Sequence, residues 1–103
     1  MKLTRAKSFK ADRPWGSKEL ARFGDIAVKA HWTDQPYRWH QNTGREVFMV
    51  VDGVVDMHVR EKGDERVITL TAGDALTIEE GEEHVAHPRG EARILVIEDV
   101  NSD

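Results

Sequence analysis

The stretch WHQNTGREVFMVVDG, residues 39–53, combines potential ligand side chains with the pattern of a β-strand. His40, Asn42 and Glu46 fall within seven residues and run directly into an apolar segment. In an extended chain, residues two apart point to the same side of a sheet, so His40 and Asn42 would face the same way. Glu46 would share the interior face with Phe48. This stretch therefore predicts a binding site at the end of a buried strand.

The rest of the chain reads as short strands separated by turns. Short strands that are interrupted about every ten residues by glycine-containing turns indicate an all-β sandwich or barrel. Segment 46–51 is apolar on both faces, so we expect it to be buried on both sides. Asp52-Gly53 is the kind of pair that closes a β-hairpin, and residues 62–65 predict another turn. The expected strands span residues 25–33, 46–51, 54–60, 66–70, 75–78, 85–86 and 92–97.

Length and composition are typical of one globular domain, residues 1–103. The hydrophobic content of 39% is enough for a core, and the absence of cysteine excludes disulfides and thiolate ligands. No apolar run approaches the roughly 20 residues of a membrane helix, and the N-terminus has no apolar signal segment. We therefore expect a cytoplasmic protein that does not act at a membrane.

The charge of the chain is uneven along its length. Residues 1–22 hold seven Lys and Arg against two Asp and Glu, whereas residues 23–103 hold eight against seventeen. A basic segment could contact nucleic acid, but no nucleic-acid motif and no interleaving of aromatic with basic residues follows. We expect residues 1–13 to form a solvated basic arm or an edge strand, and we expect no nucleic-acid partner.

Two histidines and one glutamate could form a metal site. A buried carboxylate must be paired, hydrogen-bonded or bound to a metal, and Glu46 is expected on an interior face. His84 follows a turn at Glu80-Gly81 and could approach from another strand. Two His and one carboxylate form a facial ligand set that suits Fe(II), Mn, Ni, Cu or Zn and leaves coordination positions open. Spacing alone favours a solvent-exposed or structural role for these histidines over metal binding.

The spacing resembles the two sequence motifs of the cupin family. The first motif has His-x-His, three or four residues, Glu, six residues and Gly, and its positions are occupied here by His40, Asn42, Glu46 and Gly53. The second motif has Gly, five residues, Pro-x-Gly, two residues, His, three residues and Asn. Its positions are occupied, in order, by Gly73, Glu79, Gly81, His84 and Pro88.

Several positions depart from the family pattern. The largest departure is Asn42 in place of the second histidine, because an amide oxygen can bind a metal but is a weaker ligand than imidazole. Gln41 could take that role if the strand is irregular. A register that pairs Arg38 with His40 lies outside the family spacing. The leading Gly of the first motif and the Pro and Asn of the second are replaced by Asp34, Glu79 and Pro88.

The resemblance implies a double-stranded β-helix, a jelly-roll barrel of two packed antiparallel sheets that is usually dimeric. Residues 36–98 would form the core barrel. The resemblance further implies a divalent transition metal inside the barrel. The side chains placed around it are those of His40, Asn42, Glu46 and His84.

Residues 13–16, Arg-Pro-Trp-Gly, resemble the start of the cupin domain of type II mannose-6-phosphate isomerases. We interpret this as kinship within a subgroup, with Trp15 as a hydrophobic plug on the barrel. Aromatic side chains with a few polar groups line small-molecule pockets, although Phe48 could equally belong to the core. We expect His31 and His58 at the surface. The pocket candidates are Tyr37, Trp39, Phe48 and His87.

Three functions are compatible with these residues. The first is a metal-dependent enzyme that acts on a small polar or sugar-like molecule. The second is a non-catalytic module that binds or senses a small ligand, with a degenerate or empty metal site. The third, a structural homodimer without a ligand, is disfavoured because burying His40, Asn42 and Glu46 without a partner would be costly.

Overall fold

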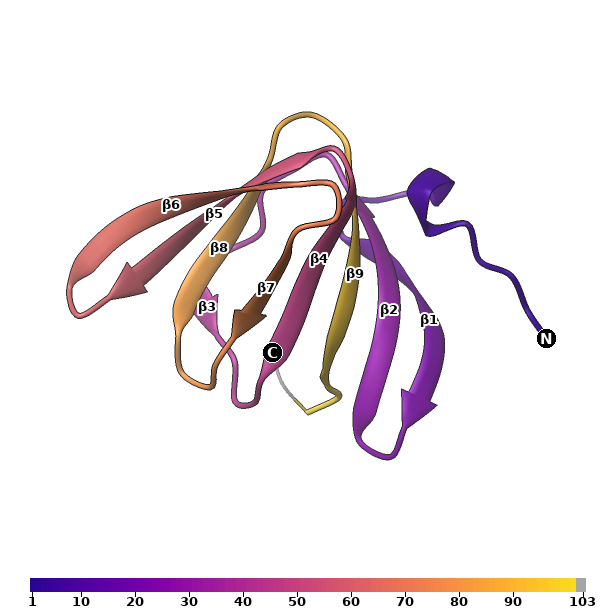
Figure 1. Ribbon diagram of the computed structural model, residues 1–103, viewed down its shortest axis with the longest axis horizontal. Helices are drawn as coiled ribbons and strands as arrows, with labels where there is room; N and C mark the ends of the chain where they lie inside the picture. Colours follow the sequence, from indigo (N-terminus) through magenta and orange to yellow (C-terminus); the bar gives the residue numbers. More distant parts are fainter. Residues whose placement is uncertain (102–103) are drawn as a thin grey trace.

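The computed structural model describes residues 1–101, and the strands within this range form two antiparallel sheets (Figure 1). A single short 3₁₀ helix in this range, η1 (Ala6–Ser8), precedes the strands, and no helix there is long and apolar enough to cross a membrane. The five-stranded sheet contains, in order, β1 (Gly16–Phe23), β2 (Ile26–Thr33), β9 (Ala92–Asp99), β4 (Glu46–Asp52) and β7 (Ala75–Ile78). The four-stranded sheet contains, in order, β3 (His40–Gln41), β8 (Glu83–Pro88), β5 (Val54–Glu61) and β6 (Asp64–Thr71). The expected all-β architecture of two packed sheets is confirmed.

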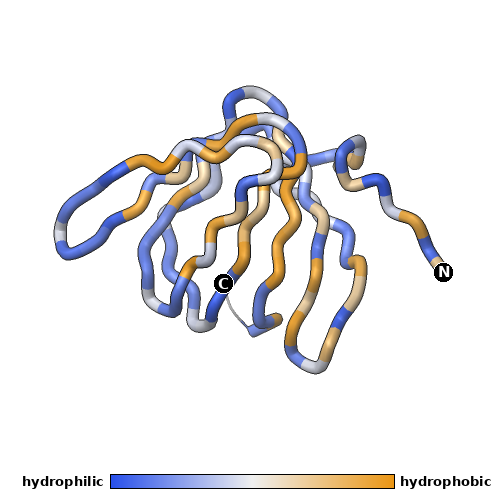
Figure 2. Tube along the Cα trace, viewed as in Figure 1, coloured by the Kyte–Doolittle hydropathy of each residue, from blue (hydrophilic) through white to orange (hydrophobic). Residues whose placement is uncertain are grey.

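The core lies between the two sheets. Alternate residues of β4 point inward, so that Phe48 and Val50 are buried, and Ile94 of β9 packs beside them. Val55 and Met57 of β5 meet them from the other sheet. Figure 2 shows this pattern as hydrophobic β4 and β9 strands and a hydrophilic tip on the β5–β6 hairpin. These core residues fill one part of the space between the two sheets. The polar side chains that form the candidate site lie in the remaining part.

Strand β1 was absent from the sequence prediction. It pairs with β2, but the register shifts between Glu19 and Ala21, which marks a β-bulge. A bulge adds a residue to one strand and breaks the period of two by which a strand is recognised. The strand is also largely exposed and carries Lys18 and Arg22 on an edge of the sheet. Its alternation was therefore hidden in the sequence.

The hairpin prediction at Asp52-Gly53 is wrong. Strand β4 pairs with β7 and β9, whereas β5 pairs with β6 and β8, so the chain changes sheets at this point. Gly53 has φ +89°, and a Cβ atom there would lie 2.6 Å from the carbonyl oxygen of Glu91. Glycine is required for this tight corner between sheets. The predicted turn at residues 62–65 does close a hairpin, between β5 and β6. Lys62 and Gly63 both have positive φ there, and Asp64 already belongs to β6.

The N-terminal arm packs on one end of the outer face of the five-stranded sheet, over Trp32 and Arg93. Arg93 Nε donates to the carbonyl of Phe9 at 2.8 Å, and Lys10 Nζ lies 5.3 Å from the ring centre of Trp32. Trp32 is consequently buried although it lies on the outer face, in register with Arg93. His31, its neighbour in β2, points to the opposite, inner face, in register with the buried Ile94. The apolar alternation of β2 therefore marks its outer face.

Candidate metal centre

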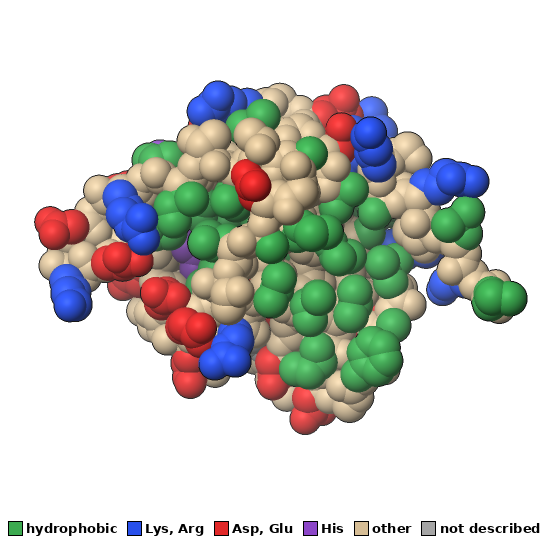
Figure 3. All heavy atoms as spheres, viewed as in Figure 1, with side chains coloured by type: hydrophobic (Ala, Val, Ile, Leu, Met, Phe, Trp, Pro, Cys, Tyr) green, Lys and Arg blue, Asp and Glu red, His purple; other side chains and the backbone are tan. Residues whose placement is uncertain are grey.

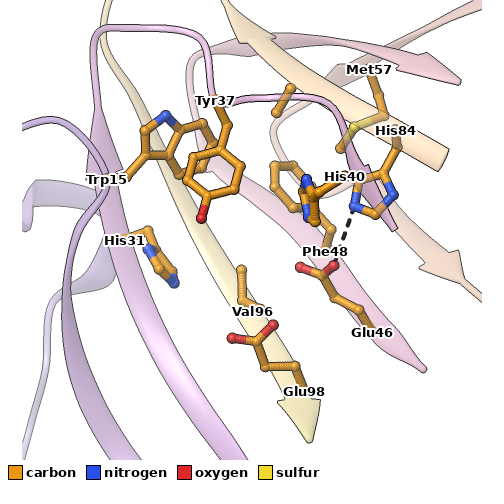
Figure 4. Close-up of a pocket in the computed structure, with 11 residues that line it drawn as sticks. Trp15, His31, Tyr37, His40, Glu46, Phe48, Met57, His84, Val96 and Glu98 are labelled. Carbon is orange, nitrogen blue, oxygen red and sulfur yellow. Dashed lines mark ion pairs between the residues drawn. The ribbon is translucent and has the colours of Figure 1, made fainter. Parts of the chain in front are cut away.

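Three strands from both sheets bring His40, Glu46 and His84 together. His40 of β3 and His84 of β8 are directly paired, and their ring centres lie 4.2 Å apart. Glu46 begins β4 in the opposite sheet and points toward them (Figure 4). One ligand atom from each of these residues lies within 4.8 Å of the others. The three side chains that the sequence placed around a metal thus form one cluster.

Both histidines are oriented by a backbone carbonyl two residues earlier. Nδ1 of His40 donates to the carbonyl oxygen of Arg38 at 2.9 Å, and Nδ1 of His84 donates to that of Glu82 at 3.0 Å. A carbonyl only accepts, so each Nδ1 carries the proton. In the neutral ring this leaves the lone pair on Nε2, and a partner of this kind fixes the tautomer of a metal-binding histidine.

Glu46 and His84 form a buried ion pair, with His84 Nε2 3.6 Å from Glu46 Oε1. Burial alone would raise the pKa of Glu46, but hydrogen bonds from His84 and Asn42 outweigh it and hold that pKa below the ordinary value. Burial alone would lower the pKa of His84, but its hydrogen bonds with Glu46 and with the Glu82 backbone outweigh that effect and raise it. In the metal-free protein, both shifts favour the charged form of the pair.

Asn42 is buried beside Glu46 and has a fixed orientation. Its Nδ2 donates to Glu46 Oε1 at 2.7 Å. Because a carboxylate only accepts, the amide cannot be turned around. Its Oδ1 is therefore left buried without a hydrogen-bond partner in residues 1–101. An unsatisfied buried acceptor costs about 1–3 kcal/mol, so this oxygen calls for a partner that the described protein atoms do not supply.

These donors fit a divalent transition metal. Nitrogen and carboxylate ligands lie about 2.0–2.2 Å from such a metal, which places two ligand atoms on one ion roughly 3–4 Å apart. The separations within 4.8 Å in the cluster are close to this range, and the half-buried His40 can adjust. The buried Oδ1 of Asn42 is a further oxygen in need of an electropositive partner. Gln41, the alternative for the second position, is exposed, and so is Arg38, which the alternative register would make the first.

The cluster lies in the wall of a cavity of about 130 Å³ between the sheets (Figure 4). Tyr37 and Phe48, two of the pocket candidates, line this cavity. Trp39 lies outside it, with the guanidinium of Arg60 3.8 Å from its ring centre. His87 lies on the outer face of the second sheet, where its ring centre is 4.3 Å from that of the half-buried His58.

Several residues of the cavity wall were missed in the sequence. His31, expected at the surface, lines the cavity, and this expectation is wrong because it took the apolar side of β2 as the inner one. Glu98 also lines it and is paired with Glu46 across β4 and β9. Neither was visible in the sequence, because residues 94–97 of β9 are apolar on both faces and only the register of the strands decides which side chains point inward. Trp15, interpreted as a plug, contributes its indole to the same wall.

Comparisons with known proteins agree with this geometry. Residues 25–98 match the family model described as the cupin domain, and no curated protein matches the chain. A cupin-2 domain containing protein from Shewanella frigidimarina is 28% identical with a TM-score of 0.77, covering 86% of this chain and 84% of that one. A cupin superfamily protein from Desulfitobacterium hafniense is 17% identical with a TM-score of 0.79, covering 96% and 90%. Hydroxypropylphosphonic acid epoxidase from S. wedmorenis is similar in fold alone, at 16% identity and a TM-score of 0.63 over 71% of this chain and 42% of that one. Because the family model spans most of its length, the chain belongs to the cupin domain family.

Proposed function

We propose that this protein binds a divalent transition metal through His40, Glu46 and His84 and takes a small organic ligand in the cavity beside it. The observation that supports the metal site most directly is the convergence of three ligand atoms within 4.8 Å, with both histidine tautomers set by backbone carbonyls. Fe, Mn, Ni, Cu and Zn are all compatible with two imidazoles and a carboxylate. Asn42 holds the carboxylate of Glu46 in place.

The protein groups have separate tasks in this proposal. A bound metal would act as a Lewis acid that polarises an oxygen of the ligand. His84 would hold the metal through Nε2, and a ligating imidazole nitrogen must be free of its proton, so metal binding and protonation of His84 would compete. Tyr37 and Phe48 shape the cavity and keep water from the ligand. Metal affinity should therefore rise with pH as His84 loses its proton.

Two activities are compatible with such a site, and we favour a metal-dependent enzyme that acts on a small polar molecule. The supporting observation is the largely apolar cavity beside the cluster, since a poorly hydrated site strengthens electrostatic interactions with a reacting group. The alternative is a non-catalytic binding or sensing protein, which the replacement of the second histidine by Asn42 favours. Turnover of a ligand identified by binding would distinguish the two.

The metal proposal can be tested with Co²⁺ as a spectroscopic probe. Protein freed of metal with a chelator should bind one Co²⁺ per chain and show visible absorption bands, and His84→Ala should lose this binding. His87→Ala is the matched control, because His87 lies on the same strand but faces outward. Equal Co²⁺ affinity in native protein and His84→Ala would overturn the proposal.

We also propose that the outer face of the five-stranded sheet binds a second copy of this chain. Hydrophobic side chains gather over β4, β9 and β2 in Figure 3. A face of this kind can pair with itself about a two-fold axis. In sedimentation, Met49→Glu should lower the molecular mass to that of a monomer; native protein that is already monomeric would refute this. The half-buried residues concerned are Val28, Val47, Met49, Leu95 and Ile97.

A further inference from the structure

We propose that His31 forms a second polar end of the cavity, and that the ligand is a compact molecule with a flat apolar body and a polar group at each end. One polar group would meet the metal centre and the other the imidazole of His31. This inference rests on the proposed metal-binding function and extends it to the class of ligand. It assigns a positioning role to a residue outside the metal cluster.

His31 enters the cavity from β2, while His40 and His84 enter from strands of the other sheet (Figure 4). Its Nδ1 is buried and has no hydrogen-bond partner in residues 1–101. Burial lowers the pKa of His31 and keeps the ring neutral, although a backbone hydrogen bond with Trp15 raises that pKa. A neutral imidazole offers one donor and one acceptor, and a half turn of the ring exchanges the position of Nδ1 with that of a carbon. One ring nitrogen of His31, Nδ1, is thus left for a hydrogen bond that the described residues do not make.

The residue that covers His31 is held in a costly backbone conformation. Trp15 has φ +60°, a region in which a bulky side chain is an outlier. Its turn is closed by a hydrogen bond from Gly16 N to the carbonyl of Arg13 at 3.1 Å, and its Nε1 donates to the carbonyl of Gln35 at 2.9 Å. The indole consequently lies edge-on to His31, with ring centres 6.2 Å apart. Strain maintained at a cavity wall is typical of binding sites, where it positions a side chain in advance.

The size of the cavity limits the ligand. A volume of about 130 Å³ is slightly below the roughly 150 Å³ of an engineered cavity that accepts benzene. The enclosed part of the ligand is therefore about one six-membered ring in size. Trp15 and Tyr37 stand edge to face, with ring centres 5.3 Å apart, and form an aromatic wall along one side. An aromatic wall favours a flat body that can stack against it or meet its edge.

The walls between the two polar ends argue against a ligand that is polar all round. Phe48, Met57, Ala86 and Val96 form the apolar part of the cavity wall and have no side-chain hydrogen-bonding group of use to a hydroxyl. A sugar ring of the same size would bury several hydroxyls there without partners, each at a cost of about 1–3 kcal/mol. Polar groups are accommodated by the metal cluster at one end and by His31 at the other, and the wall holds two further polar side chains, those of Tyr37 and Glu98. The structure thus selects a dipolar, ring-sized compound over a carbohydrate.

The test compares two phenols of nearly equal shape on the full chain loaded with Zn²⁺, a redox-inert metal. Hydroquinone has a hydroxyl at both ends of a benzene ring, and 4-fluorophenol has one hydroxyl and a fluorine. Calorimetry under anaerobic conditions should show hydroquinone binding about tenfold more tightly, the effect of one buried hydrogen bond. In His31→Phe, which keeps an aromatic ring of similar size, the ratio should fall to near one while 4-fluorophenol binds as before.

Two further variants separate a positioning role from a structural one. His31→Gln retains a side-chain donor and acceptor and should restore part of the preference for hydroquinone. His58→Phe replaces a histidine on the outer face of the second sheet and should leave the preference unchanged. An equal ratio in native protein and His31→Phe would overturn the inference, as would failure of the zinc-loaded protein to bind either phenol. In that last case intact zinc binding would leave the proposed metal function standing, whereas a chain that holds no zinc would remove both.

Discussion

The role of Asn42 can be isolated by replacing it with leucine. Asn42→Leu keeps a buried side chain of similar size but removes both polar atoms of the amide. The Nδ2 atom donates to Glu46 Oε1 at 2.7 Å, and the Oδ1 atom is a buried acceptor without a partner in residues 1–101. The substitution therefore removes a favourable hydrogen bond and an unfavourable buried acceptor at once. The stability of the fold and the affinity for metal should respond differently to this change.

The magnitudes follow from these two atoms. A hydrogen bond to a charged group contributes about 1.5–3 kcal/mol, whereas relief of a buried unsatisfied acceptor returns about 1–3 kcal/mol. The free energy of unfolding of the metal-free protein should therefore change by no more than about 2 kcal/mol in either direction. Metal affinity should behave differently, because loss of a group that orients a ligand typically costs 10- to 100-fold, or about 1.4–2.7 kcal/mol. Asn42→Leu should weaken metal binding without weakening the fold.

Urea denaturation in the presence of a chelator measures the first quantity, and calorimetric titration with Zn²⁺ measures the second. Gln41→Leu is the control, since Gln41 is exposed and its Nε2 makes a long contact of 3.5 Å with Glu83 Oε1. It should keep native zinc affinity. The reasoning is refuted if Asn42→Leu binds zinc as tightly as the native chain, and a loss confined to Gln41→Leu would assign the orienting role to Gln41.

Three further predictions concern pH, a corner of the fold and a surface ion pair. The pKa of His84 is raised in the folded protein, so His84 stabilises the fold below pH 6.5 and loses this effect as pH rises through its folded pKa. The pKa of Glu46 is lowered, so Glu46 stabilises the fold above pH 4.5 and loses this effect as pH falls through its folded pKa. Urea denaturation of metal-free protein should therefore show His84→Gln losing more stability at pH 5.5 than at pH 9, and equal losses would contradict the pairing. Gly53→Ala should destabilise more than Gly63→Ala, because the two have similar φ of +89° and +84° but an added Cβ meets Glu91 O at 2.6 Å only at Gly53; equal melting temperatures would count against the crowded corner. Hydrogen bonds from Arg89 and Thr69 lower the pKa of Asp56 to about 2, so Arg89→Met should raise this pKa toward 3.8 in an NMR titration, and no shift would show that Arg89 is not its main cause.

The seven strands predicted from the sequence are all present, because each carries its alternation within its own residues. Phe48 and Val50 on one strand and Val55 and Met57 on another face the core as this pattern requires. The metal cluster was similarly accessible, because His40 and His84 belong to motifs with a set spacing. What these features share is that the information lies in one contiguous stretch of chain.

The features that the sequence did not reveal depend on pairings between distant strands. Asp52-Gly53 looks locally like a hairpin, and the change of sheet there is decided by β4 pairing with β9 and by the close approach of Glu91. His31 looks like a surface residue, because its apolar neighbours appear to mark the core side of β2. That side is the outer face of the sheet, and the N-terminal arm buries only its Trp32 end. To predict such features correctly, one must know what packs on each face of a sheet.

Asn42 and His31 both bear on where the ligand is recognised. Asn42 stands where the family motif has a histidine, and His31 lies outside the metal cluster. If Asn42 serves as a donor to Glu46, the metal keeps three protein ligands and has one more position open than it would with a third imidazole. A ligand oxygen can fill that position, but metal coordination by itself distinguishes poorly among small oxygen-containing molecules. Discrimination then depends on the opposite wall, where Nδ1 of the neutral His31 can accept one hydrogen bond. The proposed preference for hydroquinone over 4-fluorophenol should therefore survive Asn42→Leu as long as zinc is held, since it arises from His31 and not from the metal shell.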